Sequence, residues 1–526
     1  MKKTNLRPAA CMLALSMSLT VAAGCGNDSV QQESSGAAVP DANKKYTFTM
    51  ASEQLVPVEA EGELIKYWED KFNVDIDIWN LESSKYNDLL NLRFASGEIP
   101  DKIVVKSSID LQKYVDQDLL AEIPLEMLQK NAPTVYKSLT TFEPNIFNYT
   151  MLDGKIYGLP FVGTDNKFHV PIVYRGDWMK NVGVDKAPET LAELETLMYK
   201  FAKEDPDKNG KNDTYGLSAT GLDMVYGAYG YKPEYWKVKD GKMVYGAVQP
   251  EMKQALSTLS KWYKDGIIDP EFITGENKGG YFSISHAFSS SKIGLTQIGM
   301  YYHWKPLLFT GDSASNSYLD VQKANAQAAE SLVYGTPVKG PDGKIGSPAT
   351  GSILTGGYLS FGKQLEKEPD KMAKLLQVIE GMNADYESAM TALFGIKGKH
   401  WDFNEAQVPV LLNKLTNNDI SKIGGHTQIN SIQLPDWTVK RTQLRVDWAV
   451  EHKFDQNVVW DELRTNLPSN SKYLAELNKI KDEAYISIIV GDKPLDYFDE
   501  FAAKWDKSGG AQLVKEANEW YAALKK

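Results

Sequence analysis

Strand-like and helix-like patterns alternate through the first part of the chain, and this alternation constrains the fold more than any other feature. Residues 46–50 alternate like a strand, residues 64–72 carry apolar side chains at helical spacing, and residues 74–78 alternate again. A second predicted helix, 84–96, leads into a short apolar strand at 102–105. Strands that alternate with helices predict parallel pairing through helical crossovers, and therefore an α/β fold.

Similar patterns continue along most of the chain. Hairpins are predicted at 154–160 and around Asp240-Gly241, each centred on residues that favour tight turns. Further strands are predicted at 172–174 and 352–361, and further helices at 189–201, 250–264, 369–382 and from 472 onward. A chain of 526 residues exceeds one ordinary domain, so we expect at least two.

The N-terminal residues predict a secretory signal that ends in a lipid-attachment site. Lys2, Lys3 and Arg7 precede an apolar stretch at about 9–23, which is too short to span a membrane as a mature helix. The stretch closes on Ala22-Ala23-Gly24-Cys25, which resembles a bacterial lipobox, where a diacylglycerol is attached to the cysteine thiol. The alternative is an ordinary secretory signal followed by an incidental cysteine.

The residues after this motif are polar and predict a flexible tether over 25–43. The chain has two cysteines, Cys11 inside the signal and Cys25 at its end, so a disulfide framework is excluded.

Composition narrows the classes of function. A net charge of −11 argues against nucleic acid as a partner, because nucleic-acid binding depends on neutralising phosphates. The 12 Trp and 27 Tyr residues supply flat rings for the core and for stacking on the apolar faces of sugars. The sequence contains no HExxH, G-x-S-x-G or P-loop motif. A pair of carboxylates for glycoside hydrolysis stays open as an alternative.

One polar loop has the ligand spacing of an EF-hand-like calcium site. Calcium prefers six to eight hard oxygen ligands, and alternate residues on a tight turn point theirs inward. The candidate ligands, in order, are Asp205, Asp207, Asn209, Lys211 through its backbone carbonyl, and Asp213. Gly210 stands at the sixth position, but Gly216 replaces the bidentate glutamate at the twelfth. We expect a structural Ca²⁺ here, and the alternative is a solvated acidic turn.

Five segments, taken together, resemble family 1 extracellular solute-binding proteins of carbohydrate ABC importers. The similarity runs from about residue 46 to 521 and is strongest to large lipoproteins associated with oligosaccharide uptake. The segments are Ala95–Asp101, Asp118–Ile123, Tyr174–Trp178, Ser291–Trp304, in which Ser291 replaces the family's usual glycine, and Ile489–Gly510.

The resemblance implies a two-lobed fold like that of periplasmic binding proteins. Each lobe is expected to be a mainly parallel sheet flanked by helices, with the ligand cleft at the hinge. The expected division is a signal peptide at 1–24, a tether at 25–43, an N-lobe at 44–163 and 337–395, and a C-lobe at 164–336 and 396–526.

The function implied by the resemblance is that of a binding protein and not of an enzyme. The chain is expected to capture an oligosaccharide and deliver it to the transmembrane subunits of an ABC permease. It would act as a monomer held by its lipid on the extracellular face of the cell membrane. A Gram-positive cell is favoured, and the alternative is the periplasm of a Gram-negative cell. The alternatives are a surface-anchored polysaccharide-active enzyme and a binder of a non-sugar solute such as a peptide.

The resemblance also suggests which residues line the cleft. Trp304 closes a segment that carries a sugar-stacking ring in the family, and Tyr235 and Trp236 precede a hairpin where related proteins place another. Each of these rings has core packing as its alternative. The remaining candidates are Glu53, Lys106, Ser107 and Ser108 at strand ends, Asn166 and Lys167 near the first crossing, and Arg175, His303 and Trp401.

Overall fold

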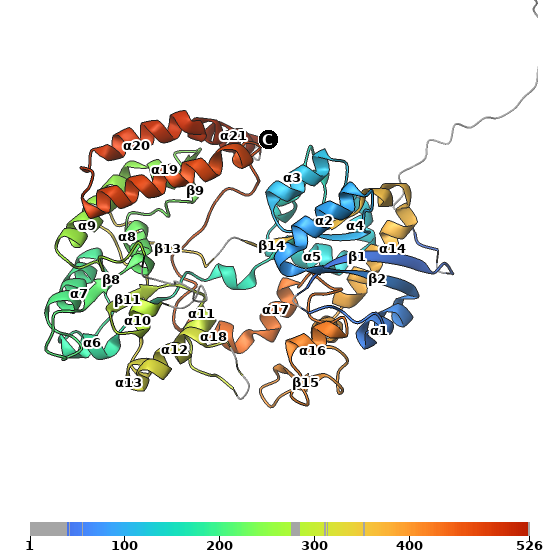
Figure 1. The fold of residues 1–526 in the computed structure, drawn as a ribbon, viewed down its shortest axis with the longest axis horizontal. Coiled ribbons are helices and arrows are strands. Elements are labelled where there is room, and N and C mark those ends of the chain that lie inside the picture. The colour runs from blue at the N-terminus through green and yellow to red at the C-terminus, as the bar shows by residue number, and fades with distance from the viewer. Residues whose placement is uncertain are drawn as a thin grey trace, which may run out of the picture.

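The protein consists of two lobes that lie side by side, each with its own sheet (Figure 1). The computed structural model describes residues 39–523 except 42, 55, 275–284, 310, 311, 313, 351 and 352. The predicted signal peptide, Cys25 and nearly all of the predicted tether lie outside these residues. In the described part of the chain, no helix is both long and apolar enough to cross a membrane.

The first lobe is built on a five-stranded sheet. Its strands, in spatial order, are β2 (Val74–Glu82), β1 (Tyr46–Gln54), β3 (Lys102–Val105), β14 (Leu354–Phe361) and β6 (Leu159–Val162). β1 pairs in parallel with β2 and β3, whereas β14 runs antiparallel to both β3 and β6. All four residues of β3 are buried, as expected for a central strand covered on both faces.

Helices cover this sheet on both faces (Figure 1). They include α1 (Glu63–Phe72), α2 (Tyr86–Ala95), α3 (Ser108–Asp116), α4 (Leu125–Asn131), α5 (Pro133–Phe142), α14 (Pro369–Asn383) and α15 (Tyr386–Phe394). A proline opens both α5 and α14, where its missing N–H costs no hydrogen bond. The main core of this lobe packs Leu64 and Trp68 of α1 against Phe48 of β1.

The second lobe has a four-stranded sheet. Its order is β12 (Val333–Gly335), β7 (Ile172–Tyr174), β11 (Ile293–Gln297) and β8 (Tyr215–Leu217). Around it lie α6 (Gly176–Asn181), α7 (Leu191–Lys203), α8 (Leu222–Ala228) and α9 (Pro250–Lys264), with the hairpin β9 (Trp236–Lys239) and β10 (Lys242–Tyr245). A capping box between Thr190 and Glu193 starts α7, because each side chain bonds the other residue's backbone N–H.

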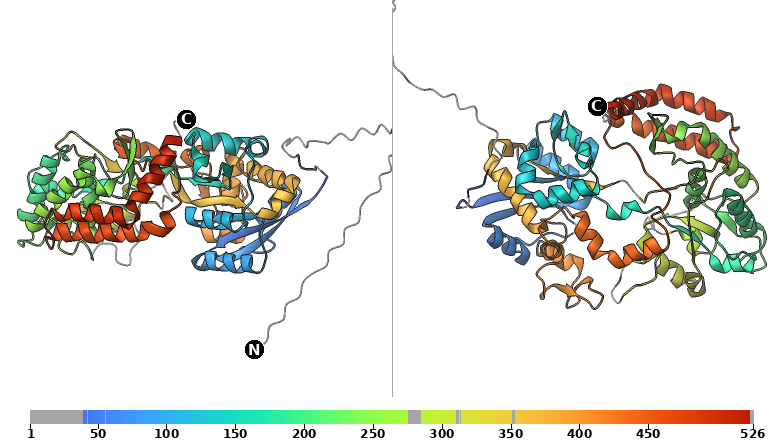
Figure 2. Two further views of the ribbon diagram at one scale, coloured as in Figure 1. Left: turned by 90° about the horizontal axis from the view of Figure 1, so that it is seen from above. Right: turned by 180° about the vertical axis from the view of Figure 1, so that it is seen from behind.

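Three C-terminal helices complete the second lobe, as Figure 2 shows from above and behind. They are α19 (Asn470–Val490), α20 (Tyr497–Trp505) and α21 (Ala511–Ala523). Ile480, Ile488 and Trp505 from these helices belong to the same buried cluster as Leu256 and Trp262 of α9. The chain end therefore strengthens the second lobe and does not form a domain of its own.

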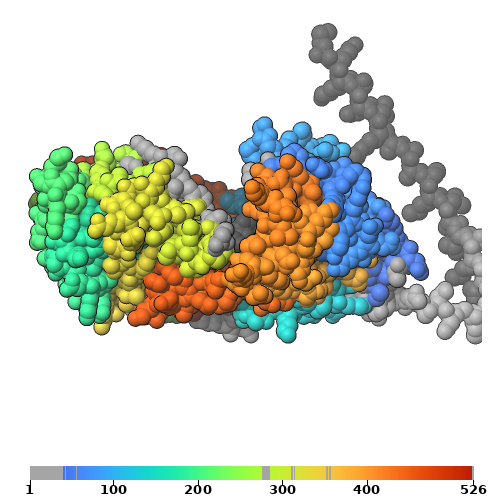
Figure 3. Space-filling view, turned by 90° about the horizontal axis from the view of Figure 1, so that it is seen from below, coloured from blue at the N-terminus to red at the C-terminus, as the bar shows by residue number. Residues whose placement is uncertain are grey.

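The chain crosses between the lobes several times. The first crossing follows β6 through the 3₁₀ turn Thr164–Lys167, and the second joins β13 (Ser347–Pro348), which pairs with β17 (Val458–Val459), to β14. A third crossing runs through α17 (Pro435–Arg441) and α18 (Gln443–Glu451). In Figure 3 the lobes are separate masses, bridged on this face by the orange-to-red segment around α17 and α18.

The α/β, two-lobed architecture is confirmed, and β3 and α9 have the predicted bounds. Each sheet nevertheless contains one strand that runs against the others, β14 in the first lobe and β7 in the second. Parallel pairing is expected for strands joined by one helical crossover, whereas these strands return to the sheet after long excursions.

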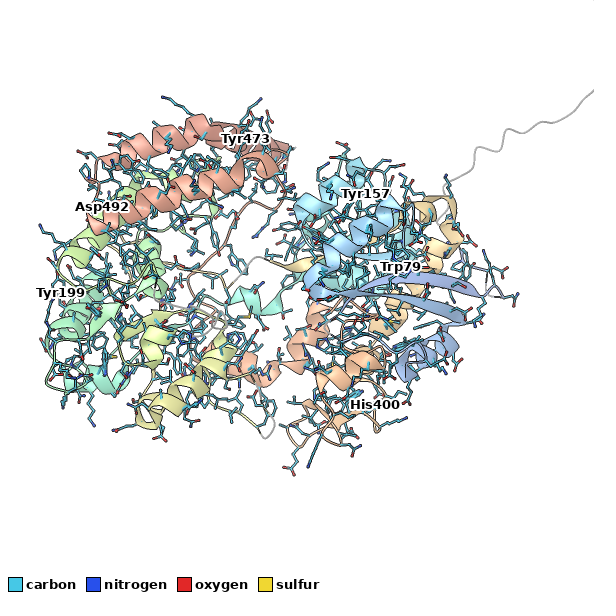
Figure 4. All side chains as sticks on the ribbon, in the orientation of Figure 1. Trp79, Tyr157, Tyr199, His400, Tyr473 and Asp492 are labelled. Carbon is cyan, nitrogen blue, oxygen red and sulfur yellow. The ribbon has the colours of Figure 1, made fainter. Side chains whose placement is uncertain are left out.

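The expected lobe boundaries differ from the packing at one segment. Residues 396–441 were expected with the second lobe, but Ile429, Ile432 and Leu434 lie in the core of the first. The backbone N–H of Leu64 on α1 also donates to the carbonyl oxygen of Ile423, at 3.1 Å. Figure 4 accordingly shows His400 on the first lobe.

Candidate functional site: a pocket at the lobe crossings

A pocket of about 750 Å³ opens where the lobes meet, and its size is typical of small-molecule sites. Its wall contains many amides and hydroxyls but only a few apolar side chains. The lining residues are Glu53, Ser83, Val104, Phe161, Val162, Gly163, Thr164, Asp165, Asn166, Met300, Tyr302, Asn417, Asn418, Ser421, His426, Thr427, Gln428, Ser431, Gln433, Thr438 and Arg441.

Each lobe contributes one aromatic ring to this wall. Phe161 lies on β6 of the first lobe, next to the first crossing. Tyr302 comes from α11 (Tyr301–Trp304), which follows β11 of the second lobe. A ligand in the pocket can therefore contact a flat apolar surface from each side.

A loop between α16 (Asn417–Lys422) and α17 forms much of the first-lobe wall, and buried polar contacts hold it in place. The ammonium of Lys102 on β3 donates to the carbonyl oxygens of Gln428, at 3.3 Å, and Ile429, at 2.5 Å. The Ser52 hydroxyl on β1 donates to the Gln428 side-chain oxygen at 2.7 Å. The loop is thus fastened to the sheet beneath it, which keeps its outward side chains in the pocket wall.

Ionised groups occupy two parts of the wall. Glu53 forms an ion pair with Lys106, whose Nζ lies 2.7 Å from Oε1 of Glu53. At the crossing, Asp165 accepts a hydrogen bond from the Tyr301 hydroxyl at 2.8 Å. Burial raises the pKa of Asp165 above its usual range and lowers the pKa of the nearby Arg441 guanidinium.

Three of the predicted ligand-binding residues lie at or beside this pocket. Glu53 and Asn166 line it directly, and Lys106 contacts it through its ion pair with Glu53. The expectation that open α/β sheets present ligand-binding groups at the carboxyl ends of their strands is consistent with the position of Glu53 at the end of β1.

The structure places the three predicted tryptophans in cores instead of in the pocket. Trp304 is 1% exposed, packs edge-on against Phe288, and donates from Nε1 to the Ile298 carbonyl oxygen at 2.7 Å. Trp236 is buried in the main cluster of the second lobe, and Trp401 lies in a small cluster with Met390. Core packing, the alternative for Trp304 and Trp236, therefore describes both of these rings, and Trp401 is packed in the same way, because burying an indole removes a large apolar area from water.

Arg175, His303 and Tyr235 do not line the pocket either. Arg175 is held by Asp177, with Nε 2.8 Å from Oδ1 of that carboxylate. His303 is buried, which lowers its pKa to about 4, and its Nδ1 accepts from the Met300 backbone N–H at 3.1 Å. Tyr235 is partly buried, and burial raises its pKa to about 12.

The other predicted polar residues have local roles. Ser107 caps α3 by accepting from the Asp110 backbone N–H at 3.0 Å. The carbonyl oxygen of Ser108 lies 3.5 Å from the amide nitrogen of Asn466, a contact between the lobes. The ammonium of Lys167 lies 5.2 Å from the centroid of the Phe168 ring.

The predicted calcium loop is compact and internally bonded. The side-chain amide of Asn209 donates to Asp207 at 2.8 Å and to Asp213 at 3.1 Å, and Asp205 accepts from the Gly210 N–H at 3.0 Å. Gly210 has a φ of 78°, the left-handed conformation that the sixth position of such a loop needs. Within the described residues, no group of three or more His, Cys, Asp or Glu side chains is arranged to hold a metal ion.

The sequence interpretation missed most of the pocket, above all the segment 417–441. A signal was present, because Thr416 and Asp419 have the spacing of a capping box and predict the start of α16. After Gly424-Gly425, polar side chains also alternate with the buried Ile429, Ile432 and Leu434. Such alternation indicates a loop whose apolar side chains are buried in the core and whose polar side chains face the other way.

A comparison with known protein families finds a match to solute-binding proteins. Residues 56–284 match the family model described as bacterial extracellular solute-binding protein. The similarity to that family is shown over these residues. The matched residues include the first-lobe strands β2, β3 and β6, the first crossing and the strands β7 and β8 of the second lobe.

Full-length relatives and a solved structure extend the similarity beyond the matched domain. Two proteins of Bacillus subtilis (strain 168) are similar: Lipoprotein LipO is 24% identical, with 98% of each chain covered, and the polygalacturonan/rhamnogalacturonan-binding protein YtcQ is 27% identical, with 96% of each covered. The structure of an EF-hand mutant of the Streptococcus pneumoniae ABC-transporter substrate-binding protein FusA, in complex with fructo-nystose, has a TM-score of 0.59. It is 19% identical, and the match covers 92% of this chain and 99% of that one. At this identity, the likeness to FusA shows a shared fold.

Proposed function

We propose that this protein is the substrate-binding component of an ABC importer and captures an oligosaccharide in the pocket between its lobes. The observation that carries this proposal is the pocket wall, which combines amides and hydroxyls with one ring from each lobe, Phe161 and Tyr302. Sugars present hydroxyl-rich edges and apolar faces, so a sugar site needs both directional polar groups and flat rings.

The lobe arrangement supports transport by capture and release. A ligand that contacts Phe161 and Tyr302 at the same time binds a closed arrangement of the lobes better than an open one. That difference in affinity shifts the population toward the closed state, which a permease can distinguish from the empty protein. Hinge closure around a ligand requires flexible segments between the lobes, and the first crossing at Gly163 lies in the pocket wall itself.

The relatives support a carbohydrate ligand and a role outside the cell. One relative that matches over almost its whole length is named as a polysaccharide-binding protein, and another is named as a lipoprotein. The lipobox-like Ala22-Ala23-Gly24-Cys25 supports lipid anchoring at Cys25 after removal of residues 1–24. The protein would then face its permease from the extracellular side of the membrane, bind as a monomer, and leave its ligand chemically unchanged.

We further propose that the loop 205–213 holds a structural Ca²⁺. Its carboxylates and carbonyl oxygens are the hard ligands that calcium prefers, and Gly210 has the required left-handed conformation. The FusA structure is that of an EF-hand mutant, which supports such a loop in a protein of the same fold. The ion would cross-link a loop that follows α7, away from the pocket.

Titration calorimetry with a panel of oligosaccharides tests the main proposal. We expect heat from at least one oligosaccharide, and roughly tenfold or greater loss of affinity in Phe161→Ala and in Tyr302→Ala, because each removes a stacking surface. Tyr199→Ala is the control, since Tyr199 lies on the outer side of the second lobe (Figure 4). Unchanged affinity in both pocket variants, or cleavage of the bound glycan on incubation, would contradict the proposal.

A further inference from the structure

The pocket contains a cation without a carboxylate partner. Arg175 and Arg445 each form an ion pair, with Asp177 and Asp312 respectively. Arg441, at the end of α17, lines the pocket and forms no ion pair with any carboxylate of the part of the chain that the structure describes.

The remaining contacts of Arg441 leave part of its guanidinium unsatisfied. Its Nη2 donates to the Gln433 side-chain oxygen at 3.3 Å, and its Cζ lies 6.0 Å from the centroid of the Phe394 ring. Its Nε is buried and has no hydrogen-bond acceptor in the structure. A buried guanidinium that is short of acceptors is costly. Nε has no accessible surface, so a ligand in the pocket gains free energy by accepting from the Nη groups.

The charges around Arg441 also favour an anion at this end of the pocket. Asp165 is the pocket carboxylate whose field reaches Arg441, and one of its two oxygens, Oδ1, accepts a hydrogen bond from the Tyr301 hydroxyl. Arg441, Arg445 and Lys167 all act on Asp165 as nearby cations. Arg445 is already paired with Asp312, so Arg441 and Lys167 are the cations left near Asp165, and they outnumber it although the chain as a whole carries a net charge of −11.

The donor geometry favours an oxyanion that accepts two hydrogen bonds, and the rest of the wall narrows the class of ligand. A guanidinium presents a planar fork of N–H groups that matches the two oxygens of a carboxylate. The rest of the wall, with its amides, hydroxyls and the rings of Phe161 and Tyr302, fits a sugar. We propose that the pocket takes an oligosaccharide that contains a uronic acid, and that Arg441 binds the carboxylate of that sugar. This inference rests on the proposed function and names the substrate class of the same site.

Calorimetry with matched pairs of ligands tests the assignment. The probes are oligosaccharides of galacturonate, glucuronate and mannuronate, each paired with its carboxyl-reduced form, which keeps the ring size and loses the charge. We expect one acidic probe to bind at least tenfold more tightly than its reduced form, and added salt to weaken the acidic probe alone. A neutral oligosaccharide that carries an added sulfate ester tests whether the pocket prefers a planar carboxylate to a tetrahedral anion. We expect it to bind more weakly than the acidic probe.

Variants then assign the preference to one residue. Arg441→Gln should abolish the preference for the acidic probe, and Arg441→Lys should retain only part of it, because an ammonium keeps the charge without the fork. Lys440→Gln removes a neighbouring charge on α17 that does not line the pocket and should leave the preference unchanged. If Arg441→Gln fails to fold, Arg441→Lys takes its place. The assignment to Arg441 then requires that the preference for the acidic over the reduced probe be smaller in Arg441→Lys than in the wild type.

The outcomes separate this inference from the function on which it rests. Equal or tighter binding of neutral probes would overturn the inference and leave oligosaccharide capture standing. An acidic preference that survives in folded Arg441→Gln, or tighter binding of the sulfated probe, would overturn the assignment to Arg441 and a carboxylate. Binding of none of the probes would overturn both the inference and the proposed function.

Discussion

The ammonium of Lys102, in the centre of the first-lobe sheet, donates a hydrogen bond to the backbone carbonyl of Gln428 in the pocket wall. Lys102 is 1% exposed, and burial lowers its pKa to about 7. A buried lysine without a carboxylate partner is unfavourable for stability in its charged form. The hydrogen bonds by which Lys102 holds Gln428 and Ile429 in position therefore come at some cost in folding free energy.

The lowered pKa predicts how stability depends on pH. Between about pH 7 and the ordinary lysine pKa near 10.4, the unfolded chain binds the proton that the folded protein releases. Stability should therefore rise with pH in this window, by roughly 1.4 kcal/mol per pH unit for one proton. Denaturant unfolding of the wild type and Lys102→Met from pH 7 to 10 measures this slope. We expect a smaller slope in the variant, and equal slopes would contradict the lowered pKa.

A second prediction separates core packing from ligand binding at Trp304. Trp304→Ala should lower the free energy of unfolding by about 3–5 kcal/mol, because it opens a cavity in the second-lobe core. Trp304→Phe keeps most of the volume and loses the hydrogen bond to Ile298, so its cost should be nearer 1–2 kcal/mol. Chemical denaturation measures both, and calorimetry should find the affinity of folded Trp304→Phe unchanged. A large loss of affinity in folded Trp304→Phe would indicate that Trp304 contacts the ligand.

Much of the fold could be predicted because its signals are local. The apolar run of β3 and the helical spacing of α9 depend on neighbouring residues alone, and both elements have the predicted bounds. The direction of β7 could not be predicted, because its antiparallel partners return after long segments of chain. The packing of 396–441 on the first lobe likewise depends on contacts such as Ile423 with Leu64, which no local pattern records.

The pocket shows the same limit at the level of single side chains. The motif around α11 predicted Trp304 as the ring in the cleft, whereas Tyr302 of the same helix lines the pocket and Trp304 lies in a core cluster. Side chains two residues apart on a helix point about 200° away from each other. Tyr302 and Trp304 can therefore face opposite sides of α11, one the pocket and the other the core. Which face meets the pocket depends on how a four-residue helix docks, and hydrophobicity cannot settle this for two amphipathic rings.

The last prediction concerns calcium. Burial and the neighbouring carboxylates raise the pKa of Asp207, which indicates that the loop concentrates negative charge a cation would relieve. An ion bound only to the folded protein adds about 2.7 kcal/mol of stability at a hundredfold excess over its dissociation constant. A calcium chelator should therefore lower the melting temperature of the wild type, and Asp207→Ala should remove this sensitivity. Asp342→Ala, which removes an exposed carboxylate elsewhere on the second lobe, should keep it. A wild-type melting curve that the chelator leaves unchanged, with no calcium found by elemental analysis, would identify the loop as a solvated acidic turn held together by Asn209.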